Sequence, residues 1–496
     1  MLFGEEIGRL HWNSKAGRSY FFFSPQYFLM HRDIAPIIAP KSSPDSRFAI
    51  YGNQENKIYQ KLPPFIADSL PDDWGNILFD QWFKDNGFHD KDKTPVAKLS
   101  FIGSRAMGAF EFLPCDDNIL DEGEKLAISS LYSLALKIEQ QRDKAVILPE
   151  ESLTKKALLS VGTSAGGRFK KAVIAIAPDG SIHSGQTSVR PDWRYCIVKF
   201  NNETICQAEL EQTYYEMAVE AGIEMSCSEL ITVEGVRHFL TERFDRLSGK
   251  KVLTMSLAAI NPDAKSYEDL FKTCGKLGIP DDEKAQLFRR LSFNVLASNT
   301  DDHAKNFSFV MDDEGLWHIS KAYDLNFIFR TLNAAETDHC FALRGKCNTF
   351  TRQDLMLFAK EYGIKSAASI IAKVCSTLDS FESKARSNGV RGDIIELVGN
   401  RLTAIRSEIE GLDPELPQWP SYEIDGHTIH SFHFEKDEKG AIRIIATVDG
   451  KPSRKIIARN HPDYLLIAAQ FNDASDNLKK SMARKFLLKT NSKNNR

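Results

Sequence analysis

Four features that would assign a chain to a specialised class are missing from this sequence. No apolar run approaches the ~20 residues that a membrane helix requires, and the N-terminal segment MLFGEEIGRLHWN lacks the basic start and apolar core of a signal peptide. The eight cysteines include no CxxC pair, which argues against a zinc site or a disulfide framework. A net charge of −3 provides no global attraction to nucleic acid or anionic lipid. We therefore expect a cytoplasmic protein with reduced thiols and no membrane partner.

What the sequence contains is enough material for several packed domains. Of its 496 residues, 42% are hydrophobic and 26% are charged, which is typical of globular chains. Because domains usually hold roughly 100 to 200 residues, three or four units are expected. Changes in texture and the proline-rich linker GLDPELPQWP predict four segments, at residues 1–120, 121–245, 246–412 and 421–496.

The first segment is predicted to be a small α+β domain. Short apolar runs such as SYFFFSP alternate with glycine and proline, a pattern typical of strands and turns. Either Asp72 or Asp73 can cap a helix that begins near Trp74. Helical periodicity over residues 121–145 predicts a connecting helix.

The next two segments extend the α+β pattern. KAVIAI and RYCIVKF read as buried strands, followed by a helix over residues 209–221 and a strand in VRHFLTERFD. This is the element order of a small nucleotide-binding lobe. Residues 266–410 are predicted to be mostly helical, with one hairpin formed by FSFVM and LWHIS.

The strongest chemical signal is the segment NTDDHAKNFS. Asp301 precedes Asn306 by five positions, the spacing by which kinase catalytic loops place a proton-accepting Asp and a magnesium-binding Asn. Alone, this spacing is equally consistent with a loop held by local caps. Asp324 follows after the hairpin and can bring a carboxylate beside Asn306, and the pair would supply the hard oxygen ligands that magnesium prefers. An exposed turn residue is the alternative for Asp324.

Three other polar residues of this segment carry weaker signals. His303 and Lys305 are expected to shape the loop by hydrogen bonding. Asp302 adds a charge beside Asp301 but receives no role from the spacing.

A glycine-rich loop precedes the first buried strand, in SVGTSAGGRFKKAVIAI. Its glycines expose backbone N–H groups to an anion, and Lys170 or Lys171 can add positive charge toward phosphates. The GxxxxGK[ST] pattern of a P-loop is missing, and no helix follows the glycines as a dinucleotide fold would require. A plain flexible turn is the alternative.

Lys199 ends the second buried strand, and a lysine inside a buried strand is costly unless it is paired. Its expected partner is a phosphate, or Glu211 or Glu216 on the following helix; a solvent-facing lysine on an edge strand is the alternative. Further on, LTERF occupies the place of a hinge between lobes, where Phe244 can pack on an adenine ring or in the core.

In this order the elements resemble the HipA family of bacterial toxin kinases, over roughly residues 1–410. The resemblance is carried by LPDDWGNIL, LSFIGSRAMGAFEF, GTSAGGRFKKA, IVKF, YYEMAVEAGI, LTERFDR, NTDDHAKNFS and AYDLN. It implies a two-lobed, protein-kinase-like α+β fold with an N-terminal α+β subdomain, to which residues 421–496 add a C-terminal extension of unknown role. It also implies an ATP- and Mg-dependent serine/threonine protein kinase that is toxic to its own cell.

The resemblance also assigns residues. It implies Asp301 as catalytic base, Asn306 and Asp324 as magnesium ligands, and Lys199 as the phosphate-contacting lysine. The implied nucleotide-binding residues are Gly166, Gly167, Arg168, Phe169, Lys170, Lys171, Lys199, Glu242, Arg243, Phe244, His303, Lys305 and Asn306. In the glycine loop, Ser164, with Thr163 beside it, matches a position that family members autophosphorylate.

The partners implied are a HipB-like helix-turn-helix antitoxin, operator DNA only through that antitoxin, and a protein substrate such as an aminoacyl-tRNA synthetase. Two other functions stay open at this point. One is a catalytically silent ATP-binding regulator, and the other is a small-molecule phosphotransferase, because related loops serve hydroxyl acceptors of many sizes.

Overall fold

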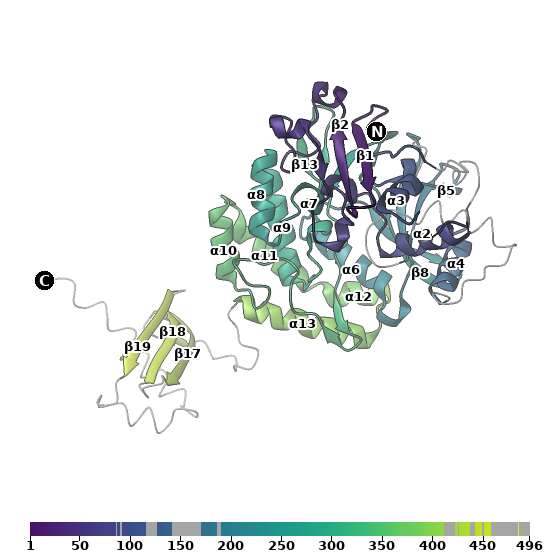
Figure 1. Cartoon of the computed structure of the whole chain (residues 1–496). Helices are drawn as coiled ribbons and strands as arrows, with labels where there is room; N and C mark the ends of the chain where they lie inside the picture. Colours follow the sequence, from purple (N-terminus) through teal and green to yellow (C-terminus); the bar gives the residue numbers. More distant parts are fainter. Residues whose placement is uncertain are drawn as a thin grey trace. The chain divides into compact units, whose positions relative to one another are not determined.

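The computed structural model of the protein divides into two compact units, Met1–Gly411 and Leu412–Arg496 (Figure 1). The described residues are 1–85, 87–89, 92–115, 126–140, 170–185, 190–410, 422–424, 426–436, 442–448, 451–457 and 485. Each unit is considered by itself below.

The first unit begins with a small sheet packed on short helices. Strands β1 (Gly8–Asn13), β2 (Arg18–Phe23) and β3 (Ile50–Tyr51) pair antiparallel in that order. Helices α1 (Pro64–Ala67), α2 (Asp73–Asp85) and α3 (Pro95–Ile102) follow. Alternation along β2 turns Phe21 and Phe23 inward against Phe65 of α1. The predicted helix cap is Asp72, whose Oδ1 accepts from the N–H of Gly75 at 2.7 Å.

A five-stranded antiparallel sheet forms the next layer. Its order is β5 (Ile182–Ser184), β4 (Lys171–Ile176), β6 (Arg194–Lys199), β8 (Val236–Glu242) and β7 (Ser228–Val233). Helix α6 (Gln207–Glu220) packs on β7 and β8, close to the predicted bounds, and it ends before Gly222, which has a φ of +84°. The helix predicted over residues 121–145 is described as α4 (Ile128–Gln140). Strands β4, β6 and β8 coincide with the strands predicted in KAVIAI, RYCIVKF and VRHFLTERFD, so these predictions are confirmed.

The rest of the unit is mainly helical, as predicted. The helices are α7 (Leu257–Ile260), α8 (Tyr267–Leu277), α9 (Asp281–Leu296), α10 (Arg352–Glu361), α11 (Ala367–Leu378), α12 (Phe381–Asn388) and α13 (Gly392–Glu410). The strands are β9 (Arg246–Leu247), β10 (Lys250–Lys251), β11 (Leu253–Ser256), β12 (Ser308–Met311), β13 (Trp317–Ile319), β14 (Phe329–Thr331) and β15 (Ala334–Ala335). The predicted hairpin is the β12–β13 pair, to which β11 adds a third strand.

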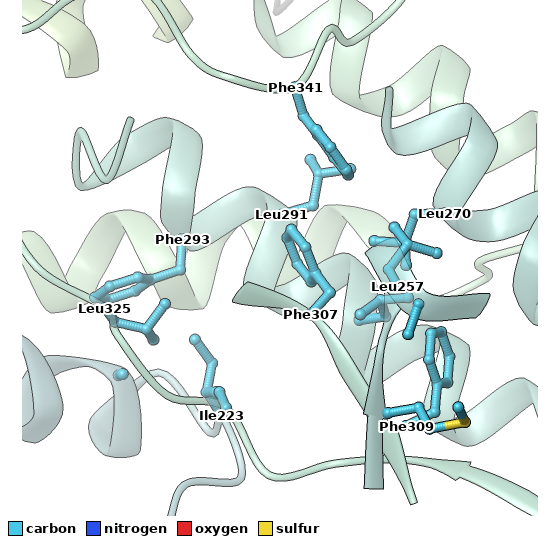
Figure 2. Packing of buried hydrophobic residues seen from close by; sticks show 14 of the residues in the cluster. Ile223, Leu257, Leu270, Leu291, Phe293, Phe307, Phe309, Leu325 and Phe341 are labelled. Carbon is cyan, nitrogen blue, oxygen red and sulfur yellow. The ribbon is translucent and has the colours of Figure 1, made fainter. Parts of the chain in front are cut away.

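One continuous hydrophobic core supports the segment around NTDDHAKNFS. Phe307 and Phe309 extend from it into a buried cluster, in which Phe307 and Phe341 stack with ring centroids 5.6 Å apart (Figure 2). Leu325, directly after Asp324, belongs to the same cluster. The polar loops are thus fixed by apolar residues on either side of them in sequence.

The second unit contains a four-stranded antiparallel sheet. Its strands pair in the order β16 (Tyr422–Ile424), β17 (His427–Lys436), β18 (Ile442–Val448) and β19 (Lys451–Ile457). The buried side chains include Ile429, Ile442 and Ile444, which gives the sheet an apolar face. Among the described residues of the whole chain, none of the helices has the length and apolar character that crossing a bilayer demands.

Candidate active site

The segment between α9 and β12 forms a tight polar loop. Helix α9 ends at Leu296, and Ser298 turns the chain with a φ of +54°. The side chain of Asn306 donates from Nδ2 to the carbonyl oxygen of Asp301 at 2.7 Å, which closes the loop between the two predicted site residues. The Asp301 carboxylate is 49% exposed, and His303 Nε2 lies 3.5 Å from its Oδ1. A half-exposed carboxylate on a closed loop can meet a solute and accept its proton.

Three charged side chains meet beside this loop. The Lys199 ammonium donates to Glu211 on α6 and to Asp324 after β13. Lys199 is 16% exposed on β6, a central strand, so it is not a solvent-facing edge lysine. Of the two predicted carboxylates, Glu211 is its partner, while Glu216 accepts from Gln212 on the same helix.

Burial and charge act in opposite directions on this triad. Burial favours the neutral form of Lys199, but the charges of Asp324 and Glu211 outweigh it and raise the lysine pKa. Burial opposes ionisation of Asp324 too, yet Lys199 lowers the net pKa of that carboxyl. For Glu211 burial prevails, and the pKa is raised. The arrangement therefore keeps the lysine charged and Asp324 ionised.

Asp324 is held in an uncommon backbone conformation. Its φ is +52°, in the left-handed region that Asp tolerates better than most residues. The neighbouring Tyr323 donates to the carbonyl oxygen of Lys305 at 2.7 Å and lies 5.6 Å from the ring of Phe244. Thus Asp324 is tied to the lysine on one side and, through Tyr323, to the polar loop on the other.

Two adjoining cavities contain the predicted site residues. The first, of about 150 Å³, is lined by Phe244, Tyr323 and residues of the N-terminal subdomain, among them Asp68 and Met107. The second, of about 480 Å³, is lined by Lys171, by Asp301, His303 and Asn306 of the polar loop, and by the triad Lys199, Glu211 and Asp324. Both cavities share the triad, so they are two parts of one cleft. A cleft with an aromatic part and a charged part suits a nucleotide.

All three predicted hinge residues, Glu242, Arg243 and Phe244, line the first cavity. Glu242 also pairs with Arg194 at 2.9 Å. Arg243 lines the same cavity, and its guanidinium is fully buried against Asp245, at 2.7 Å. Phe244 is the aromatic residue of the hinge, and its ring lies beside that of Tyr323.

The two candidate lysines of the glycine loop differ in their surroundings. Lys171 begins β4, directly opposite Lys199 in the ladder, and its side chain is 2% exposed. Its Nζ lies 2.5 Å from Asp72 Oδ2, so in this structure the ammonium is bound by the N-terminal subdomain. Lys170 is half-buried, and its carbonyl oxygen accepts from the N–H of Phe200 at 2.9 Å.

Six of the predicted positions cannot be placed. Thr163, Ser164, Gly166, Gly167, Arg168 and Phe169 lie outside the described residues. Their assignments stay predictions.

Sequence analysis missed three residues that the structure brings to the site. Asp72 appeared only as a helix cap, Tyr323 had no assignment, and Asp302 had no role. The Tyr267 hydroxyl donates to the buried Asp302 carboxylate at 2.6 Å. For Asp302, the doubled acid in NTDDHAKNFS was the available signal. No pattern in the sequence pointed to Asp72 as a partner of Lys171.

Two family models match the chain. Residues 1–113 match the HipA N-terminal domain, and residues 163–381 match the HipA-like C-terminal domain.

Among solved structures, the chain is similar to HipA in the complex of the Shewanella oneidensis MR-1 toxin–antitoxin system with HipB and operator DNA. The two share 16% identity with a TM-score of 0.55, over 82% of this chain and 95% of that one. The chain also has a weaker likeness to the Helicobacter pylori proinflammatory kinase CtkA, at 12% identity and a TM-score of 0.33, over 44% of this chain and 89% of that one. The first match confirms the predicted HipA-type α+β fold.

Proposed function

Since the chain belongs to the HipA family, we propose that it is an ATP- and Mg-dependent serine/threonine protein kinase that acts as the toxin of a bacterial toxin–antitoxin pair. The observation that carries the proposal is the meeting of Asp301, Asn306, Lys199 and Asp324 in the lining of one cavity. These residues come from a loop, a strand and a second loop, and kinase chemistry needs all four types together.

In this proposal each side chain has a role that its type and surroundings support. Asp301, half exposed, accepts the proton of the acceptor hydroxyl. Lys199, kept charged by Glu211 and Asp324, binds phosphate oxygens. Phe244, beside Tyr323, packs against the adenine ring in the aromatic part of the cleft.

Oxygen atoms of Asn306 and Asp324 are suitable ligands for a magnesium ion. Asn306 uses Nδ2 for its bond to Asp301, and that bond leaves the amide oxygen uninvolved. Asp324 offers an ionised carboxylate on the same cavity wall. An amide and a carboxylate oxygen, completed by phosphate oxygens and water, are the ligands that magnesium selects. When bound, the ion would neutralise charge that develops on the transferred phosphoryl group.

The partners are part of the same proposal. The similar HipA is seen with HipB and operator DNA, which supports a HipB-like antitoxin, and DNA contact through that antitoxin, for this chain. The protein substrate we propose is a translation component such as an aminoacyl-tRNA synthetase. Autophosphorylation at Ser164 or Thr163 would add nearly two negative charges where ATP phosphates bind, and would silence the enzyme.

The deciding experiment compares induced expression of the wild type with that of Asp301→Asn, combined with transfer of label from γ-labelled ATP to proteins of a cell lysate. We expect the wild type to arrest growth and to label protein, and Asp301→Asn to do neither. Asp313→Asn is the matched control, since this acid is 85% exposed in the β12–β13 turn.

Other outcomes identify other functions. Equal growth arrest by both forms without any label would contradict the kinase proposal and favour a catalytically silent ATP-binding regulator. Label that appears only on small molecules would favour a small-molecule phosphotransferase instead.

A further inference from the structure

Asp302, next to the proposed base, is buried and fully engaged. Its side chain has no exposed surface, in contrast to the half-exposed Asp301. Oδ2 accepts from the Tyr267 hydroxyl at 2.6 Å and lies 2.8 Å from His339 Nδ1, and Oδ1 accepts from the N–H of Phe341 at 3.2 Å. A buried carboxylate without partners would be very costly, and these three contacts compensate the burial of Asp302 while joining it to Tyr267 and to residues 339–341.

Two of these partners belong to one segment of chain, residues 339–341. The N–H of Cys340 donates to the carbonyl oxygen of Thr300 at 3.0 Å, so this segment runs directly along the polar loop. Phe341 is 2% exposed and stacks on Phe307, which anchors the same segment from the core side (Figure 2). The segment is therefore held by Asp302 at one edge and by the core beneath it.

The same segment borders the proposed base. The thiol of Cys340 is exposed and lies 4.0 Å from Asp301 Oδ1. Residues 344–349, after the buried Leu343, are exposed as well. The N–H of His339 donates to the carbonyl oxygen of Cys347 at 2.7 Å, and this hydrogen bond closes residues 339–347 into a loop. The exposed Cys340 thus places residues 339–349 beside the carboxylate of Asp301.

A chain of buried polar groups fixes Asp302 from the opposite side. Tyr267 is fully buried, and burial raises its pKa well above the usual value, so the phenol stays protonated and donates. Its oxygen accepts from Asn294 at 3.1 Å, and Asn294 accepts from Asn299 at 2.9 Å. Because α8 and α9 supply Tyr267 and Asn294, the position of Asp302 is set by the helical core and does not depend on the mobile ends of surface side chains.

We propose that Asp302 is a positioning residue of the kinase reaction: it fastens residues 339–341 along the catalytic loop and so sets the wall against which the protein acceptor is aligned with Asp301. The inference rests on the proposed kinase function. Asp302 does not touch nucleotide or acceptor, and it acts through Asp301 and the 339–349 segment. Since a shift of about 1 Å in reacting groups can reduce a rate about 10²-fold, loss of this fastening would impair transfer to protein while leaving the nucleotide part of the cleft in place.

The test compares Asp302→Asn and Tyr267→Phe with the wild type and with Tyr214→Phe. Tyr214 is the matched control, because it too is a fully buried phenol, with its hydroxyl 2.6 Å from the carbonyl oxygen of Ala297. Three quantities are measured for each purified chain: the rate of label transfer from saturating MgATP to lysate protein, the Kd of MgATP by calorimetry, and amide hydrogen exchange over residues 339–349.

We expect Asp302→Asn to lower the transfer rate about 10²-fold with the Kd of MgATP within threefold of the wild type, and to accelerate exchange over residues 339–349. Tyr267→Phe should shift both quantities in the same direction by a smaller factor, and Tyr214→Phe should shift neither. Equal loss of MgATP binding and transfer in Asp302→Asn would reveal a general structural role and overturn the inference.

The exchange measurement separates the two proposals. If the wild type labels nothing, the kinase function fails, and the positioning role fails with it. If the wild type labels protein but exchange over residues 339–349 is unchanged in Asp302→Asn, the fastening fails while the kinase function stands.

Discussion

Replacing Lys199 by methionine tests the charge arrangement on which the proposed site depends. The substitution leaves Glu211, 5% exposed, and Asp324, 27% exposed, as neighbouring carboxylates without their cation. Breaking a buried ion pair costs about 3–5 kcal/mol. Because Asp324 keeps some contact with water, we expect the lower end of this range, about 3 kcal/mol.

This loss corresponds to a measurable shift in Tm. At about 2.1 cal/mol/K per residue, unfolding of the unit Met1–Gly411 has an entropy of about 0.9 kcal/mol/K. A loss of about 3 kcal/mol therefore lowers Tm by about 3 °C, which differential scanning calorimetry of the purified chain resolves at pH 8.

The difference should shrink at lower pH. In the wild type, the depressed pKa of Asp324 contributes stability that is present above its unfolded value of about 3.9 and is lost as the pH falls through the folded pKa. Without Lys199, burial and the neighbouring charge raise the pKa of both carboxyls, and the resulting penalty disappears as they take up protons. The Tm of Lys199→Met should therefore approach that of the wild type between pH 8 and pH 5.

A triple substitution provides the critical control. Lys199→Met with Glu211→Gln and Asp324→Asn removes all three charges while retaining shape, so it should be more stable than Lys199→Met alone at pH 8. If the triple variant is no more stable, or if the Tm difference is the same at pH 5 and pH 8, the reasoning from uncompensated buried charge is refuted.

Two other predictions concern charges outside the triad. Asp245 is fully buried and pairs with Arg243 at 2.7 Å, so Asp245→Asn should destabilise the chain by about 3–5 kcal/mol in urea unfolding; a change below 1 kcal/mol would contradict this. Hydrogen bonds from His318 to Glu283 and Asp312, at 2.7 and 3.2 Å, raise the His318 pKa above 6.5 despite partial burial. The stability that this pair contributes is complete below about pH 6.5 and is lost as the pH rises through the folded pKa. His318→Gln should therefore lower Tm more at pH 6 than at pH 9, and an equal change at both would count against the ion pair.

Part of the fold and of the candidate site could be predicted from local patterns in the sequence. Period-two alternation in RSYFFF and the continuous apolar run KAVIAI predict strands, because side chains alternate across a sheet wherever the chain is extended. The cost of a lysine in the buried strand RYCIVK predicted that Lys199 is paired, either with a phosphate or with a carboxylate of the following helix. The closeness of Asp301 and Asn306 could be predicted as well, because a segment of five residues spans only a short distance.

Local patterns could not predict which of several candidate residues becomes the partner of a given side chain. Glu211 and Glu216 both follow Lys199 on one helix, and only the packing of α6 on the sheet turned Glu211 toward the lysine and Glu216 toward Gln212. Arg243 was expected at the nucleotide and lines the first cavity, but no local pattern showed that its guanidinium pairs with Asp245, to which the N–H of Gly108 also donates.

The sequence by itself determined the element types, the kinase-like order of the motifs and the pair Asp301 and Asn306, since each depends on residues close together in the chain. The tertiary structure decided that Lys171 is neutralised by Asp72, 99 positions earlier in sequence, and that Asp302 is joined to His339. Both contacts lie between segments whose approach is set by the burial of apolar cores. No local sequence pattern predicts which polar groups become neighbours when these apolar cores are buried.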